Sequence, residues 1–259
     1  MSDYNNETLN LDDEGWIHRL WEWAYENNLD EEVIPRIKQD LLEQTSLHLS
    51  SMDLTSIPKE IGYLKELRYL YFDDNYLTEI PKEIGNLKEI DYLDLSNNAL
   101  SELPKEISNL SNLELLNLTD NHFETIPEGI WTLTNLTLLS LSGNALVSVS
   151  RKLGNLINLQ TLSLSGNHLT SLPSEIGCCT QVKTLNLSVN PLKDIPREVC
   201  NLIDLEYLNL LETDIKYLPN EIINLTNLRP ITFTDTILDN LNSSQVDWFR
   251  EYLNRKKID

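Results

Sequence analysis

The chain has 259 residues, 41% of them hydrophobic, which is enough to bury the core of one compact domain or one repeat array. Its formal net charge is −21, from 20 basic and 41 acidic side chains. Such a surface repels phosphate, which argues against nucleic acid and anionic membranes and favours a protein partner with a basic surface. Solubility alone is an alternative reason for the charge. No run of about 18 apolar residues is present, so no membrane span is expected.

The first residues, "MSDYNNETLNLDDEG", are polar and acidic, without the basic and apolar regions of a cleaved secretory signal. The chain has three cysteines and no CxxC spacing, which fits a reducing compartment better than a disulfide framework. These features predict a cytoplasmic protein. Export without a cleaved signal peptide, as an effector, is the alternative.

The stretch "DDEGWIHRLWEWAYENN" predicts a helix, because its apolar residues recur at helical spacing. Asp12 or Asp13 is expected to start it and Asn28 to end it. Its apolar stripe is expected to cover the end of a core, with partner binding as the alternative; the stripe consists of Trp16, Ile17, Leu20, Trp21 and Ala24.

From Leu47 onward the sequence repeats every 23 residues, and half a repeat precedes it at Ile34 to Gln44. A fixed period of this length is typical of a solenoid. The repeat carries a pair of alternate leucines, an Asn and a Leu-Pro or Ile-Pro step. The Asn column consists of Asn75, Asn98, Asn121, Asn144, Asn167 and Asn190.

Each element of the repeat has a physical role in one turn of a coil. Leu93 and Leu95 alternate with polar residues, which predicts a short strand with one buried face. Asn98 follows the strand, where a buried amide satisfies backbone groups that would otherwise cost about 1 to 3 kcal/mol each. Pro104 then starts the outer segment. Glycines recur in one outer slot, where we expect a tight bend; they are Gly62, Gly85, Gly154 and Gly177.

These motifs resemble the leucine-rich repeat family, in its 23-residue form LxxLxLxxNxLxxLPxxIxxLxx, over about residues 34 to 241. They are most similar to soluble bacterial and intracellular Ras-group members. The resemblance implies an α/β fold: a right-handed solenoid, or horseshoe, with a parallel sheet on its concave face. The pattern changes at Val149-Ser150, Thr213 and Cys179.

Terminal coils expose core, so helical caps are expected at both ends. We divide the chain into an N-terminal cap with a half repeat (1–44), the repeat array (45–241) and a C-terminal cap (242–259). Ser243 or Ser244 is expected to start the last helix, and the basic residues Arg255, Lys256 and Lys257 suit its C-terminal end.

No catalytic, cofactor or metal site is expected. His122 and His168 share a slot two repeats apart, about 10 Å at strand spacing, too far to hold one ion. Cys179 is expected to be buried, whereas Cys178 and Cys200 are expected to be exposed thiols without a nearby base. Trp131 is expected either to anchor an interface or to lie across neighbouring coils.

The concave face is the predicted binding site. Tyrosines on two adjacent strands are expected to form aromatic anchors inside an acidic rim; the site consists of Tyr69, Tyr71, Asp73, Asp91, Tyr92 and Asp94. The predicted function is a non-enzymatic protein–protein interaction module for a basic, Arg-bearing partner, without a small-molecule substrate. A bacterial effector or adaptor that presents a target to a catalytic protein in trans is one alternative. A mainly structural repeat protein, whose tyrosines merely pack along the sheet, is another.

Overall fold

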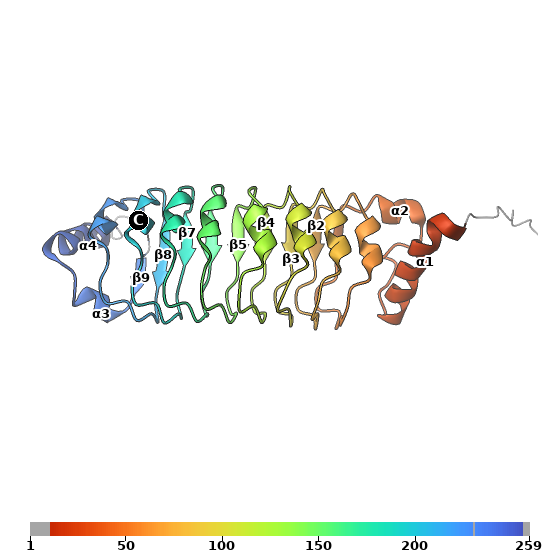
Figure 1. Cartoon of the computed structure of the whole chain (residues 1–259), viewed down its shortest axis with the longest axis horizontal. Helices are drawn as coiled ribbons and strands as arrows, with labels where there is room; N and C mark the ends of the chain where they lie inside the picture. The colour runs from red at the N-terminus through yellow and green to blue at the C-terminus, as the bar shows by residue number, and fades with distance from the viewer. Residues whose placement is uncertain (1–10, 230, 256–259) are drawn as a thin grey trace, which may run out of the picture.

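The computed structural model describes residues 11–229 and 231–255, and its main feature is one sheet of nine parallel strands in sequential order (Figure 1). The strands are short because each belongs to one turn of a coil. They are β1 Ser46–His48, β2 Tyr69–Tyr71, β3 Tyr92–Asp94, β4 Leu115–Asn117, β5 Leu138–Ser140, β6 Thr161–Ser163, β7 Thr184–Asn186, β8 Tyr207–Leu210 and β9 Ile231–Phe233.

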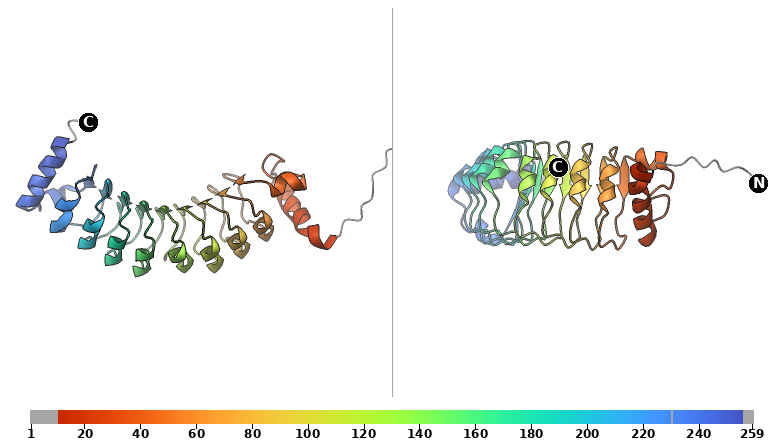
Figure 2. Two further views of the ribbon diagram at one scale, coloured as in Figure 1. Left: turned by 90° about the horizontal axis from the view of Figure 1, so that it is seen from above. Right: turned by 45° about the vertical axis from the view of Figure 1, so that its right-hand side comes forward.

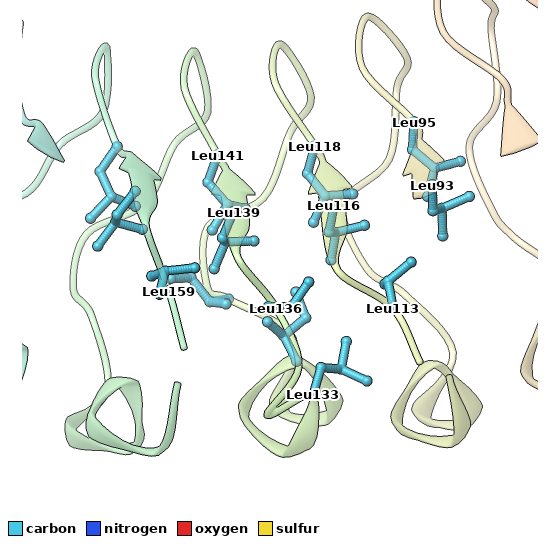
Figure 3. Close-up of a cluster of buried hydrophobic side chains, with 14 of the residues drawn as sticks. Leu93, Leu95, Leu113, Leu116, Leu118, Leu133, Leu136, Leu139, Leu141 and Leu159 are labelled. Atoms are coloured by element: carbon cyan, nitrogen blue, oxygen red, sulfur yellow. The ribbon is translucent and has the colours of Figure 1, made fainter. Parts of the chain in front are cut away.

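The strands pair in register, so that equivalent residues of successive repeats lie side by side. Leu70 pairs with Leu93, and Leu93 pairs with Leu116. The leucines of each coil therefore stack on those of the next and form a continuous core (Figure 3). One coil alone has too little apolar surface to fold, and burial between coils supplies the stability of the array.

A short 3₁₀ helix lies on the outer side of each coil, opposite the strands, and the array bends into a shallow arc with the strands on its inner side (Figure 2). These helices are η1 Lys59–Tyr63, η2 Lys82–Asn86, η3 Lys105–Asn109, η4 Glu128–Thr132, η5 Arg151–Asn155, η6 Ser174–Cys178, η7 Arg197–Asn201 and η8 Asn220–Asn224. All except η5 follow a proline in an extended conformation, as the Leu-Pro step predicts. Ser150 replaces that proline before η5, and its hydroxyl accepts a hydrogen bond from the Lys152 N–H at 3.2 Å.

The asparagine column is buried and hydrogen-bonded, which confirms its predicted structural role. Asn121 accepts from the Leu100 N–H at 2.9 Å and donates to the carbonyl oxygen of Leu95 at 2.9 Å. The same bonds recur at each Asn of the column, so every carboxamide joins two consecutive coils. Thr213 breaks the column, and its hydroxyl donates only to the Leu210 carbonyl at 2.8 Å.

Glycine recurs in the outer slot for a reason other than the expected tight bend. Gly62 does not have a positive φ; instead, an added Cβ would lie 2.5 Å from the carbonyl oxygen of Glu83 on the next coil. At the glycines of this slot, consecutive coils therefore approach each other too closely for a side chain. Trp131 fills this slot in η4 and is buried, which favours the predicted alternative that it lies across neighbouring coils and not the one that it anchors an interface.

Helix α1 (Leu11–Glu26) covers the first coil, and the short helix α2 (Lys38–Leu42) follows it. Leu20 is fully buried, and the ring of Trp16 stacks on Tyr63 of η1 at 4.8 Å. Asp12 or Asp13 is the predicted first residue of this helix, and both lie within it, because α1 spans Leu11–Glu26. The helix ends at Glu26, two residues before the predicted Asn28. Asn28 follows the helix with a φ of 56°, and the Leu29 N–H donates to the Ala24 carbonyl, so Asn28 terminates the helix in a Schellman motif.

At the other end, helices α3 (Asp235–Leu238) and α4 (Ser243–Arg255) follow β9. Asn242, rather than Ser243 or Ser244, caps α4 in a reciprocal capping box with Gln245. The Gln245 amide also donates to the carbonyl oxygens of Leu218 and Pro219, which fixes the helix to the last repeat. Lys256 and Lys257 lie outside the described residues.

Candidate protein-binding surface

The concave face is formed by the strand residues that alternate with the buried leucines. Tyr69 and Tyr71 lie on β2, and Tyr92 and Asp94 lie on β3, the adjacent strand. The register pairs Tyr69 with Tyr92 and Tyr71 with Asp94. Because neighbouring parallel strands lie about 4.8 Å apart, these side chains lie close together at the N-terminal end of the sheet.

Three of the rings on this face contact one another. The ring centroids of Tyr71 and Tyr92 are 5.0 Å apart, and those of His48 and Tyr71 are 4.4 Å apart with an interplanar angle of 10°. Together with Tyr69, which is 41% exposed, these residues form what we call the aromatic surface: His48, Tyr69, Tyr71 and Tyr92. Sequence reasoning missed His48 as a site residue, although its position 23 residues before Tyr71 already placed it in the same column.

Asp94 does not lie on an exposed rim, contrary to expectation. It is only 7% exposed, and its carboxylate accepts four hydrogen bonds. The Tyr92 hydroxyl donates at 2.8 Å, the Asn117 amide at 3.0 Å, and the Ser96 hydroxyl and N–H at 2.6 and 3.0 Å. These donors occupy its lone pairs, so Asp94 orients Tyr92 instead of offering a charge to a partner.

The other two acidic residues of the predicted rim differ in availability. Asp91 forms an ion pair with Arg68 on the preceding coil, which reduces the charge that it can offer to a partner. Asp73 is half-buried, and one of its carboxylate oxygens accepts from the Ser50 hydroxyl at 2.6 Å, which leaves the second oxygen without a hydrogen-bond donor among the described residues. Asp73 is therefore the member of the rim best placed to meet a basic side chain.

Tyr92 remains a hydrogen-bond donor over the ordinary pH range. Burial raises the pKa of its phenol, and the hydrogen bond to Asp94 raises it further. A neutral phenol bound to a buried carboxylate fixes the ring, so one face of the aromatic surface is held in place before any partner arrives.

The central repeats form a floor of hydroxyl side chains with the half-buried Leu115 and Leu138, instead of a second aromatic cluster. The hydroxyls of Thr119 and Ser140 lie 2.7 Å apart, as do those of Ser142 and Ser163. Because these hydroxyls bond to each other, they have less capacity to bind a partner. The floor therefore separates the two ends of the concave face.

The three cysteines differ in burial. Cys179 is buried as predicted, and its thiol contacts the Leu153 carbonyl at 3.4 Å. Cys178 is exposed, but Cys200 is buried, so the expectation of an exposed thiol there is wrong. Cys200 occupies the slot of Gly177 on the next coil, a slot in which the glycines lie close to the neighbouring coil. Burial raises the pKa of Cys179 and of Cys200 to about 12, which keeps both as unreactive thiols.

Among the described residues, no group of three or more His, Cys, Asp or Glu side chains is placed to hold a metal ion.

The comparisons with known proteins agree with this architecture. A family model described as a leucine-rich repeat region matches residues 40–150 and 81–189, which together cover more than half of the chain. The chain belongs to the leucine-rich repeat family. No curated protein sequence matches it. Within the described helices, none is long and apolar enough to cross a membrane.

Several solved structures share the fold. A leucine-rich repeat protein of Leptospira interrogans is 30% identical over 77% of this chain and 69% of its own, with a TM-score of 0.59. Internalin C2 from Listeria monocytogenes is 25% identical over 80% of this chain and 92% of its own, with a TM-score of 0.70. The plant peptide hormone receptor RGFR1, in complex with RGF2, is 37% identical over 75% of this chain, with a TM-score of 0.68. This chain spans about a third of that receptor, 33% of its length.

Proposed function

We propose that this leucine-rich repeat chain is a non-enzymatic protein–protein interaction module, and that it binds a basic segment of its partner on the aromatic surface. The observation that carries the proposal is the stack of His48, Tyr71 and Tyr92 on the concave sheet. The alternate leucines already fill the core beneath these strands, so the rings are not needed there. Partially exposed aromatic side chains on a rigid sheet are typical of binding hot spots.

The charge of the chain supports a basic partner. Acidic side chains exceed basic ones by 41 to 20, and Asp73 borders the rings with a partly open carboxylate. An arginine of the partner can stack on a tyrosine ring and bond to this carboxylate at the same time. Asp94 contributes indirectly, because it holds Tyr92 in position.

The solved relatives support the general class of function. The plant receptor RGFR1 was solved in complex with RGF2, and a second plant membrane receptor was solved with CASPARIAN STRIP INTEGRITY FACTOR 2. Both cover about three quarters of this chain, 75% and 76%. Fold likeness alone does not define a site, so the location of binding rests on the aromatic surface.

Affinity capture from the source cell, followed by mass spectrometry, tests the function. Truncation of a hot-spot side chain costs about 2 kcal/mol, so Tyr71→Ala is expected to weaken binding of the captured partner about thirtyfold. Tyr217→Ala is the matched control, because Tyr217 is an exposed tyrosine six coils away and outside the sheet. Full binding by a variant with Ala at Tyr69, Tyr71 and Tyr92 would exclude the aromatic surface as the site.

A further inference from the structure

One turn near the C-terminal end departs from the polar pattern of the repeats. Val189 has a φ of 54°, in the left-handed region that a β-branched residue tolerates least. Its side chain is 47% exposed, so no burial in the core offsets this conformation. The other repeats place small or polar residues in the same positive-φ slot: Ser51, Asp74, Asn97, Asp120, Gly143, Gly166 and Glu212.

Leu211, on the next coil, also breaks the pattern. It is 41% exposed at the end of β8, in a column that is otherwise polar: Ser50, Asp73, Ser96, Thr119, Ser142, Ser165 and Ser188. The Val189 N–H donates to the Leu211 carbonyl at 2.8 Å, so the two residues lie on directly bonded backbone. The Leu211 N–H in turn donates to the Asn209 side chain at 3.1 Å, which fixes its position.

A single exposed apolar residue needs no explanation, but this pair combines three unusual features. Both residues are exposed, both replace polar residues of the repeat, and one is held in a strained conformation. Strain of this kind persists mainly at functional sites, where an observed outlier justifies a functional hypothesis. Val189 follows β7 and Leu211 directly follows β8, so the pair borders the end of the sheet opposite the aromatic surface.

We propose that Val189 and Leu211 form a second anchor point on the concave face. One segment of the partner contacts both anchors. Its basic residue binds the aromatic surface, and a large apolar side chain of the same segment packs on Val189 and Leu211. This inference rests on the proposed function, because it assigns both anchors to one partner. Between the two anchors, the segment crosses the floor formed by the central repeats.

The geometry sets the length of that segment. Six strand steps separate β2 from β8, which is about 29 Å at about 4.8 Å per step. An extended chain rises about 3.3 Å per residue, so the basic and the apolar anchor residues lie about nine positions apart in the segment. The loop edge beside this path carries exposed carboxylates at Asp74, Asp120 and Glu212, which complement further basic residues in the segment.

Selection from a displayed library of random 12-residue peptides tests the proposal on the full chain. Selected peptides are expected to carry Arg or Lys at one end and a large apolar residue about nine positions away. Their affinities are then measured by calorimetry on a double variant, Val189→Gly with Leu211→Ser, in which each position has a residue found in other repeats. We expect affinity to fall at least tenfold while the midpoint of thermal unfolding is unchanged or higher, because glycine relieves the strained φ.

The control is Val147→Gly with Ile157→Ser, which removes two exposed apolar residues that also lie outside the strands but that, unlike Val189, have no positive φ. It is expected to leave affinity unchanged. Affinity within twofold of the wild type in the Val189/Leu211 variant would overturn the second anchor, as would selection of peptides without the paired features. Loss of binding in that variant together with full binding by Tyr71→Ala would instead overturn the proposed function of the aromatic surface.

Discussion

At the residue scale, the Asn column explains how the turn after each strand stays stable although its backbone groups do not form the regular hydrogen bonds of a sheet. The carboxamide of Asn121 accepts one backbone N–H and donates to carbonyl oxygens of two coils. It replaces the hydrogen bonds that the turn removes from the backbone. The bonds are buried, so water cannot substitute for them.

We predict that Asn121→Ala lowers the free energy of unfolding by about 3 kcal/mol, because unsatisfied buried groups cost about 1 to 3 kcal/mol each. Urea denaturation followed by circular dichroism measures the loss. Asn158→Ala is the control: its amide donates to the Thr134 carbonyl at 2.9 Å in an exposed setting, so the change is expected within about 0.5 kcal/mol. Equal losses in the two variants would contradict the structural role of the column.

The sequence predicts the Asn column well because the Asn of each repeat is surrounded by equivalent residues and makes the same hydrogen bonds. It predicts individual departures less well. The environment of Asp94 depends on donors from Tyr92, Ser96 and Asn117, three residues that vary between repeats, so its burial is not visible in the pattern. Cys200 could have been placed correctly, since it shares its slot with the glycines that mark close coil contact.

At the element scale, strands and 3₁₀ helices follow directly from the 23-residue period, whereas the end helices depend on contacts that the period does not describe. The Ile223 side chain illustrates the difference. It occupies the same slot as Cys200 and Trp131, yet it is exposed, because no further 3₁₀ helix follows η8 in the described part of the chain. Helix α4 does begin at Ser243, one of the two predicted residues, but its capping box uses Asn242 and Gln245, which the period does not predict.

We predict that Leu20→Ala in α1 lowers the free energy of unfolding by about 2 to 5 kcal/mol, as is typical for a buried leucine. Leu20 faces the first coil, so the loss would show that α1 is part of the cooperative core. Tyr25→Ala on the same helix is the control, because this ring is 81% exposed and is expected to change stability by about 0.5 kcal/mol or less. Thermal and urea denaturation measure both variants. If Leu20→Ala is as mild as Tyr25→Ala, α1 folds independently of the array.

At the scale of the whole molecule, the charge balance opposes the compact state. The 41 acidic side chains exceed the 20 basic ones by 21, so at least that many carboxylates have no basic counterpart in the chain. The described ion pairs that are exposed, such as Lys152 with Glu128, contribute little to stability. Repulsion among carboxylates therefore outweighs attraction, and a partner with a basic surface would reduce it on binding.

We predict that salt stabilises the free chain. The Debye length falls from about 30 Å at 0.01 M to about 8 Å at 0.15 M ionic strength, which screens repulsion between coils of the array. A gain of about 1 kcal/mol would raise the midpoint of thermal unfolding by about 2 to 4 °C for a chain of this size. Calorimetry over a sodium chloride series measures the shift, which is expected to level off once the Debye length is shorter than the spacing of surface charges. Sucrose is the control, because it favours the folded state without screening and is expected to show no such plateau. A midpoint that falls as salt is added would mean that ion pairs, and not repulsion among the carboxylates, dominate the electrostatics of the fold.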